Sequence, residues 1–354
     1  MLNKAKKYVN SIRYSGDVAP LDSSEIHFHQ CSKWKDVFYG NDLAISKEMT
    51  PSLYSSLSNV LAKLKIEHSS VQAFVYSSPI NNAECYLADS DSCIIRFSSS
   101  LIDLLSIDEF EFVAGHEIGH FLCDHGSQSV DDSEHSLEAL IVQRAKEISA
   151  DRLGLLACGS LNVALKALIK TMSGLNDRHL RFDISSFISQ LNKIENQPSS
   201  NSLLTHPSML VRCRALLWFS MSPSFGDHSY IFTDNERVKL DNNVTRDLDK
   251  YVDSSIREKI KEIDSDVYMW RALYEIASKG SFSKPDQFIF EKEFGSINFK
   301  KVLAFIEEES LSVLNENILA KVIESEASYR ELAPTSFNQQ IVIIKQKVLR
   351  LLEV

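Results

Sequence analysis

The feature that most constrains this chain is a five-residue motif, His116-Glu117-Ile118-Gly119-His120. On an α-helix, residues four apart are separated by about 400° of rotation, so both histidines point in the same direction. Two imidazoles on one face can bind a single Zn²⁺, and Glu117 beside them can take a proton from a metal-bound water. The motif therefore predicts a helix that supplies two ligands and a general base to a hydrolytic zinc site.

The flanking sequence predicts where this helix begins and how it packs. Ser106 and Glu109 have the spacing of a capping box, and Gly126 is a stop signal. Gly115 and Gly119 each cost about 1 kcal/mol inside a helix, relative to alanine. Two glycines four residues apart make sense if another helix, or the metal site itself, lies very close.

A catalytic zinc also needs a third protein ligand, and the best candidate is Glu147. It lies in a helical pattern from about 136 to 158. Asp151 is four residues further along the same face, where it can accept a hydrogen bond from the free N–H of a ligating histidine. Ala150 and Gly154 are small, as close packing of two helices at a metal requires.

Three segments, residues 108–120, 147–152 and 205–212, together resemble the M48 family of gluzincin metallopeptidases. The resemblance covers about residues 40–222 and implies a zincin-like fold, one Zn²⁺ per chain and hydrolysis of peptide bonds. The site residues that it implies are the zinc ligands His116, His120 and Glu147, the general base Glu117, the supporting carboxylate Asp151, and His206 and Arg212 beside the zinc.

Two positions near these motifs need separate treatment. The family pattern has Pro-Pro after the downstream histidine, whereas this chain has Pro207-Ser208. His125 follows His116 by nine residues, but the Gly and His of the metzincin motif are missing around it. We therefore expect His125 to lie behind the ligands or on the surface.

The resemblance also implies a reaction. Zinc lowers the pKa of its bound water and polarises the scissile carbonyl. Glu117 takes the water's proton and passes it to the leaving amine, while His206 donates a hydrogen bond to the oxyanion. Arg212 is expected to steady an acidic group or to contact the substrate backbone; an ordinary ion pair is the alternative.

A peptide substrate also needs a surface to bind. Residues 71–76 and 93–97 have the β-branched and aromatic composition of strands. In the resembled family an edge strand before the zinc helix pairs with extended substrate, which is β-augmentation. We assign this role to residues 93–98, with Ile94, Ile95 and Arg96 as the substrate-binding residues.

Composition restricts the class of protein. A content of 44% hydrophobic and 24% charged residues is typical of a soluble globular protein, and the net charge of −10 argues against a nucleic-acid binder. No run of 18 apolar residues occurs, so no transmembrane segment is predicted. The basic N-terminus lacks the apolar stretch of a secretory signal. Six cysteines without C-x-x-C spacing predict reduced thiols and a cytoplasmic location.

The predicted fold class is α+β. Residues 1–40 form an N-terminal extension, and residues 41–222 a zincin-like metallopeptidase domain, mostly helical with a small mixed sheet. Residues 223–240 are a linker, and residues 241–354 an all-α domain. The stretch from 270 to 295 weakly resembles the TerB-like helical domain, with Lys279-Gly280 in place of its Asp-Gly. We expect this region to bind a partner, to recruit substrate, to cover the active site in an autoinhibited state, or only to stabilise the fold.

Two functions remain open at this level. The first is a soluble zinc endopeptidase that acts on protein or peptide substrates. The second is a latent or inactive peptidase-fold protein that serves as a regulatory or protein-binding module. The complete set of His116, Glu117, His120 and Glu147 favours the enzyme, because a degenerate relative is expected to lose one of these residues.

Overall fold

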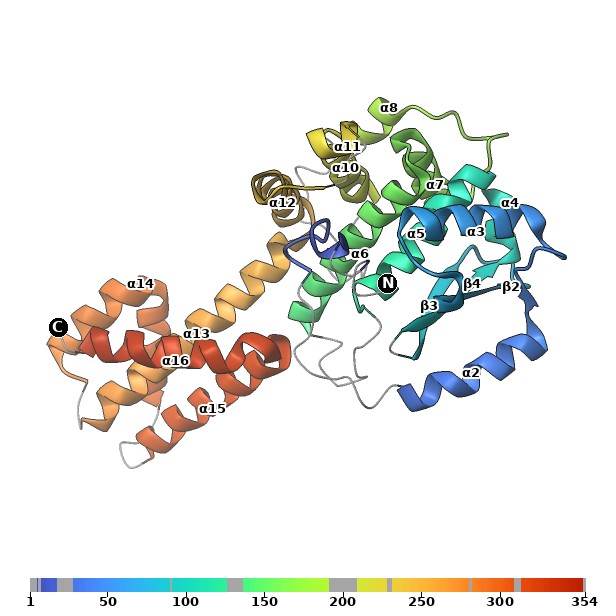
Figure 1. Cartoon of the computed structure of the whole chain (residues 1–354). Coiled ribbons are helices and arrows are strands. Elements are labelled where there is room, and N and C mark those ends of the chain that lie inside the picture. The colour runs from blue at the N-terminus through green and yellow to red at the C-terminus, as the bar shows by residue number, and fades with distance from the viewer. Residues whose placement is uncertain are drawn as a thin grey trace. The chain divides into compact units, whose positions relative to one another are not determined.

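The computed structural model describes residues 5, 8–17, 28–89, 91–125, 136–190, 209–227, 231–279, 282–308 and 313–352. They divide into two compact units, Met1–Asp131 with Ile141–Ser254, and Asp132–Leu140 with Ser255–Val354. Among the described residues, the first unit combines helices with one sheet and the second is helical (Figure 1). This composition agrees with the predicted α+β class.

The sheet of the first unit is small and mixed. Its strands are Leu43–Ala44 (β1), Val71–Tyr76 (β2), Ala83–Asp89 (β3) and Ser92–Ser98 (β4). They lie in the order β1-β2-β4-β3, with β2 and β4 parallel and the other pairs antiparallel. β4 therefore lies inside the sheet, and β3 is an edge strand.

Successive side chains of β4 point to opposite faces of the sheet, and each face has its own cover. Ile94 packs with Phe38 of helix Phe28–Asn41 (α2) and with Phe74. Cys93, Ile95 and Phe97 belong instead to the main core. That core also receives Pro51–Lys63 (α3) and Ile107–Leu122 (α5), which lie across the sheet from α2 (Figure 1).

The first unit contains further helices. They are Ser99–Leu104 (α4), Leu137–Cys158 (α6), Leu161–Ser173 (α7), Ile184–Ile188 (α8), Met209–Ser220 (α10), Pro223–Gly226 (α11) and Asp234–Leu248 (α12). Some of them pack on α5 and others on α10. The predicted capping box of α5 is present, since the Glu109 N–H lies 3.3 Å from Ser106 Oγ and the Ser106 N–H lies 2.7 Å from Glu109 Oε2. The N-terminus of α5 is thus fixed by its own sequence.

The described residues before position 40 do not form a separate extension. Val9 and Ile12 are buried in the main core, and α2 packs against the sheet. The predicted boundary at residue 40 therefore differs from the structure, in which this region contributes to the first unit.

The predicted linker over 223–240 also differs from the structure. Its described residues form α11 and the first part of α12, and α12 packs on α10. Leu240, Val244 and Leu248 are the buried face of α12. The first unit consequently continues to Ser254 rather than ending near residue 222.

Where the structure describes the second unit, it contains four long helices with a core of their own. They are Ser254–Ser278 (α13), Lys284–Glu308 (α14), Leu314–Leu332 (α15) and Pro334–Leu352 (α16). Gly295 has φ 80° inside α14 and divides it at a kink. Leu273, Phe290, Val302 and Ile344 are fully buried in this core.

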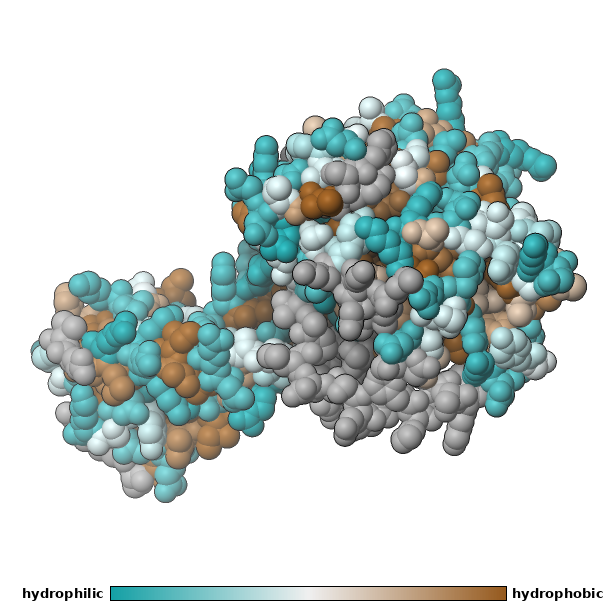
Figure 2. All heavy atoms as spheres, in the orientation of Figure 1, coloured by the Kyte–Doolittle hydropathy of each residue, from teal (hydrophilic) through white to brown (hydrophobic). Residues whose placement is uncertain are grey.

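No helix among the described residues is long and apolar enough to span a membrane. On the face shown in Figure 2, hydrophobic residues lie in small separate groups between hydrophilic ones.

Candidate metal centre

Helices α5 and α6 bring together the three side chains that the sequence predicts as metal ligands. Nε2 of His116 lies 3.1 Å from Nε2 of His120, and the carboxylate of Glu147 lies 3.6 Å and 3.5 Å from these two nitrogens. Zinc–ligand bonds of about 2.0–2.1 Å at tetrahedral angles separate ligand atoms by about 3.3 Å. Two nitrogens and one carboxylate at this spacing therefore fit a zinc ion with a fourth position left for water.

Small residues allow the two helices to approach this closely. A Cβ on Gly115 would clash with Cβ of Ala157, and one on Gly119 would lie 3.1 Å from Cα of Ala150. From the other side, a Cβ on Gly154 would lie 2.8 Å from the carbonyl oxygen of Phe112. The structure thus bears out the close helix packing that Gly115 and Gly119 predict.

Asp151 and Arg212 support the first histidine. Oδ1 of Asp151 lies 3.0 Å from Nδ1 of His116. Arg212 donates to both oxygens of Asp151, with distances of 2.7 Å and 2.6 Å, and its Nη1 lies 3.3 Å from Glu147. The pKa of Asp151 is lowered: burial opposes ionisation, but the charge and hydrogen bonds of Arg212 outweigh it. Arg212 is therefore engaged with two acidic groups of the site.

The second histidine has a different support, which the sequence did not reveal. Nδ1 of His120 lies 2.8 Å from Nδ1 of His125, and Nε2 of His125 lies 2.8 Å from Oδ2 of Asp17. Arg13 donates to both oxygens of Asp17 at 2.9 Å. His125 thus lies behind a predicted ligand, one of the two placements expected for it. Asp17 and Arg13 come from a segment that carries no recognisable motif.

Glu117 lies in the same pocket and is buried, with 9% of its surface exposed. Burial raises the pKa of its carboxyl group to about 7 in the metal-free chain. A carboxyl group with a pKa near neutrality is suited to accept and return a proton.

The pocket around these residues has a volume of about 720 Å³. Residues 81–86, which lead into β3 and begin it, form one wall, and the rest comes from α5, α6, α7 and α10 together with Leu101 of α4 and His125. The edge strand beside the candidate site is therefore β3.

This topology corrects the predicted substrate strand. Ile94 and Ile95 are fully buried in β4, which pairs with β2 on one side and with β3 on the other. Arg96 donates hydrogen bonds to Asp42 and Glu84. A strand paired on both sides cannot add a substrate strand, so residues 93–98 are not the platform. His206, the remaining predicted site residue, lies outside the described residues.

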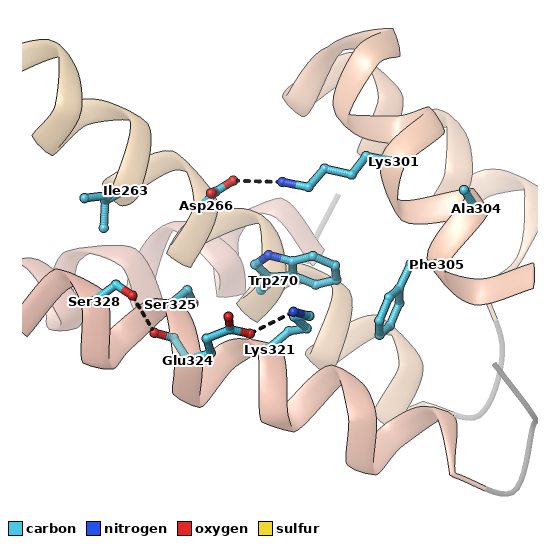
Figure 3. A pocket seen from close by; sticks show the side chains of 10 residues that line it. All are labelled: Ile263, Asp266, Trp270, Lys301, Ala304, Phe305, Lys321, Glu324, Ser325 and Ser328. Carbon is cyan, nitrogen blue, oxygen red and sulfur yellow. Dashed lines mark hydrogen bonds and ion pairs between the residues drawn. The ribbon is translucent and has the colours of Figure 1, made fainter. Parts of the chain in front are cut away.

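A second pocket, of about 560 Å³, lies within the helical unit (Figure 3). Trp270 of α13 and Phe305 of α14 form its aromatic wall, with ring centroids 5.2 Å apart. Its charged side chains pair with one another, Lys301 with Asp266 and Lys321 with Glu324. Its ten lining residues include no histidine or cysteine, and both of its acidic side chains are paired with a lysine.

Comparison with known proteins adds independent findings. The sequence profile of peptidase family M48 matches residues 48–137 and 133–218. The plastoglobule-localized metallopeptidase 48, chloroplastic, of Arabidopsis thaliana is 26% identical over an alignment of 211 residues, which covers 52% of this chain. The match spans 61% of the length of that relative. No solved structure matches the chain significantly.

Proposed function

Because this chain belongs to peptidase family M48 through residues 48–218, we propose that it is a zinc-dependent endopeptidase. The observation that carries the proposal is the convergence of His116, His120 and Glu147 at zinc-ligand spacing, with Glu117 in the same pocket. This donor set leaves one position open, as in catalytic rather than structural zinc sites.

The proposed chemistry uses few side chains. Zinc held by the three ligands would polarise the scissile carbonyl and lower the pKa of a bound water. Glu117 accepts the water's proton on its carboxylate and later donates it to the leaving amine. Its burial keeps bulk water from competing for that proton and brings its pKa close to neutrality.

The other predicted site residues receive supporting roles. Asp151 holds Nδ1 of His116, which fixes the ring and its tautomer. Arg212 acts through Asp151 and Glu147, because its guanidinium is bonded to both of these acids. We propose His206 as the donor to the oxyanion, on the resemblance of its motif alone.

Protein or peptide substrates would bind along β3. Ser98 donates its N–H to the carbonyl of Asn82 at 2.9 Å. Antiparallel pairs alternate between hydrogen-bonded and non-hydrogen-bonded positions. The N–H groups of Ala83 and Cys85 therefore point away from β4, along the wall of the pocket, where an extended substrate can accept from them.

The cytoplasmic location of the protein remains a prediction. Five cysteines are free thiols, namely Cys85, Cys93, Cys123, Cys158 and Cys213. The side chains of Cys85 and Cys93 are hydrogen-bonded to each other and not joined by a disulfide. These thiols fit a reducing compartment such as the cytoplasm.

Zinc analysis combined with cleavage of casein and of a quenched peptide tests the proposal. We expect one zinc per chain in wild type and in Glu117→Ala, with cleavage by wild type only. Removal of the general base should lower cleavage by about 10²–10⁴-fold. Zinc without cleavage by either protein would favour the latent module instead, and a chain without zinc would contradict the proposal at its root.

A further inference from the structure

We propose that Asp17 and His125 are positioning residues of the metal centre, and that they orient the ligand His120 through a chain of hydrogen bonds. The proposal rests on the zinc site proposed above. It assigns a part in that site to the N-terminal segment 8–17, which lies about 100 residues before the ligands in the sequence.

The directions of the hydrogen bonds follow from metal binding. Nε2 of His120 faces the other ligands, so a neutral, metal-bound His120 must carry its proton on Nδ1. That N–H can only donate to Nδ1 of His125, at 2.8 Å. His125 must then carry its own proton on Nε2, which donates to Asp17 at 2.8 Å. One proton arrangement therefore satisfies all three side chains.

This chain of hydrogen bonds resembles the one that supports the other histidine ligand, His116, but it contains one more residue. His116 donates directly to Asp151, whose two oxygens Arg212 holds. His120 reaches Asp17 through His125, and Arg13 holds both oxygens of Asp17. The hydrogen bonds of each ligating imidazole thus lead to a buried carboxylate, and an arginine donates to both oxygens of that carboxylate. Such partners fix the ring orientation and increase the basicity of the ligand.

The backbone places His125 for this role. Asp124 has φ 57°, in the left-handed region, directly after the end of α5. This residue turns the chain back, so that the His125 N–H donates to the carbonyl of His120 at 2.9 Å. The imidazole of His125 is held beside the ring that it is proposed to orient.

The N-terminal segment is equally well held. Val9 and Ile12 are buried, and the Ile12 carbonyl accepts a hydrogen bond of 2.9 Å from the buried Arg152. The Tyr14 N–H donates to Ser149 Oγ, on the helix that carries Glu147. The segment that carries Asp17 is consequently fixed to α6, the helix that carries the ligand Glu147.

A second metal site is the alternative use of these residues, since ligand atoms of Asp17, Cys123 and His125 lie within 4.8 Å of one another. Three observations disfavour it. Arg13 occupies both oxygens of Asp17, and both ring nitrogens of His125 are already hydrogen-bonded. Burial raises the pKa of the Cys123 thiol, which opposes the thiolate that a metal would need.

The test is zinc affinity and stoichiometry of the full chain, measured by competition with a chromophoric chelator. The variants are Asp17→Asn, His125→Phe, His125→Asn and the double variant Asp17→Asn/His125→Phe. Asp247→Asn is the matched control, because it alters a buried carboxylate of the same unit that pairs with Arg214 instead. Folding of each variant is checked by near-UV circular dichroism.

We expect His125→Phe to weaken zinc binding by about 10–100-fold, which is the usual effect of removing such a partner. His125→Asn restores an acceptor for His120 and should recover part of the loss. Asp17→Asn should weaken binding in the wild-type background but add less than about twofold to His125→Phe, since its effect passes through His125. The Co²⁺ absorption spectrum should change in His125→Phe and not in Asp247→Asn.

Several results would contradict the proposed chain of hydrogen bonds. Zinc affinity of His125→Phe or Asp17→Asn equal to that of Asp247→Asn would contradict it while leaving the zinc site intact. An undiminished effect of Asp17→Asn in the His125→Phe background would also contradict it. Two zinc ions per wild-type chain, falling to one in His125→Phe, would show a second metal site. Only a wild type without zinc would contradict the proposed function as well.

Discussion

At the scale of single residues, Glu117 is placed where a carboxyl group ionises with difficulty. It is buried beside Glu147, and although the charges of His116 and Arg212 favour its ionised form, burial dominates and raises the pKa to about 7. The metal-free site therefore holds a proton that an exposed glutamate would have released. A bound cation would favour the carboxylate form, so zinc binding and proton release from Glu117 are linked.

This linkage predicts a measurable proton count. At about pH 6, zinc binding to wild type should release up to about one proton more than binding to Glu117→Gln, because the glutamine has no proton to lose. The difference should vanish above about pH 8, where Glu117 is already ionised. Isothermal titration calorimetry in buffers of different ionisation enthalpy gives these counts. Equal counts in the two proteins at about pH 6 would show that Glu117 is already ionised before zinc binds.

Individual residues also show how far the sequence could predict the site. The helical spacing of His116 and His120 is enough to place both on one face, and Asp151 lies where the spacing from Glu147 puts it. Asp17 could not be found in the same way. It precedes His125 by 108 residues, belongs to no periodic pattern, and meets the site only because the N-terminal segment packs into the core.

At the scale of elements, the packing interface between α5 and α6, here called the seam, determines the spacing of the ligands. His116 and His120 lie on one helix and Glu147 on the other, so the distance between the helices sets the distance between the ligand atoms. Gly115, Gly119 and Gly154 leave no room for an added methyl group along this seam. A change of one methyl group there should alter both stability and metal binding.

We therefore predict that Gly115→Ala lowers the free energy of unfolding by about 1–3 kcal/mol and weakens zinc binding, because its Cβ would overlap that of Ala157. Gly40→Ala is the control. An added Cβ on Gly40 meets nothing within 4 Å in α2, so this variant should be neutral or more stable by up to about 1 kcal/mol. Chemical denaturation and zinc competition measure the two effects. Unchanged zinc affinity in Gly115→Ala would mean that the seam does not set ligand spacing.

The sheet shows a limit of strand prediction and a signal that was available. Strand composition alone does not reveal strand order, and the prediction of 93–98 as the edge rests on the resemblance, which implies an edge strand before the zinc helix. However, Cys93, Ile94, Ile95 and Phe97 form a nearly continuous apolar stretch, which is typical of a strand covered on both faces. The more polar residues of β3, among them Glu84, Tyr86 and Asp89, fit an edge.

A proline in β3 tests the substrate role of this edge. Ala83→Pro removes an N–H that points away from β4, so the sheet keeps its hydrogen bonds while a substrate loses one. We expect a fall of about tenfold in kcat/KM for an extended peptide, with zinc content unchanged. Ala83→Val keeps the N–H and should cleave like wild type. Full activity of Ala83→Pro would show that substrate does not pair with β3 at this position.

At the scale of the whole molecule, the main hydrophobic cores of the two units share no residue. The buried residues of the first core come from residues 5–240, and those of the second from residues 267–348. The boundary lies later than the sequence predicts because α12 is polar over most of its surface, as a linker would be. Its contacts with α10 and the ion pair of Asp241 with Arg152 show that it belongs to the first unit.

Separate cores predict that residues 1–254 fold and bind one zinc without the helical unit. The first turn of α6, Leu137–Leu140, groups with the second unit, and Glu138 accepts a hydrogen bond from the Thr335 N–H. Truncation should fray this turn. Glu147 lies about two turns further along α6, within the first unit, so the ligand should stay in place.

For the truncated protein we expect near-UV circular dichroism typical of a folded unit, and cleavage of a short peptide within about twofold of the full chain. A large gain in cleavage would indicate that the helical unit covers the site, whereas loss of zinc would show that the first core depends on the second.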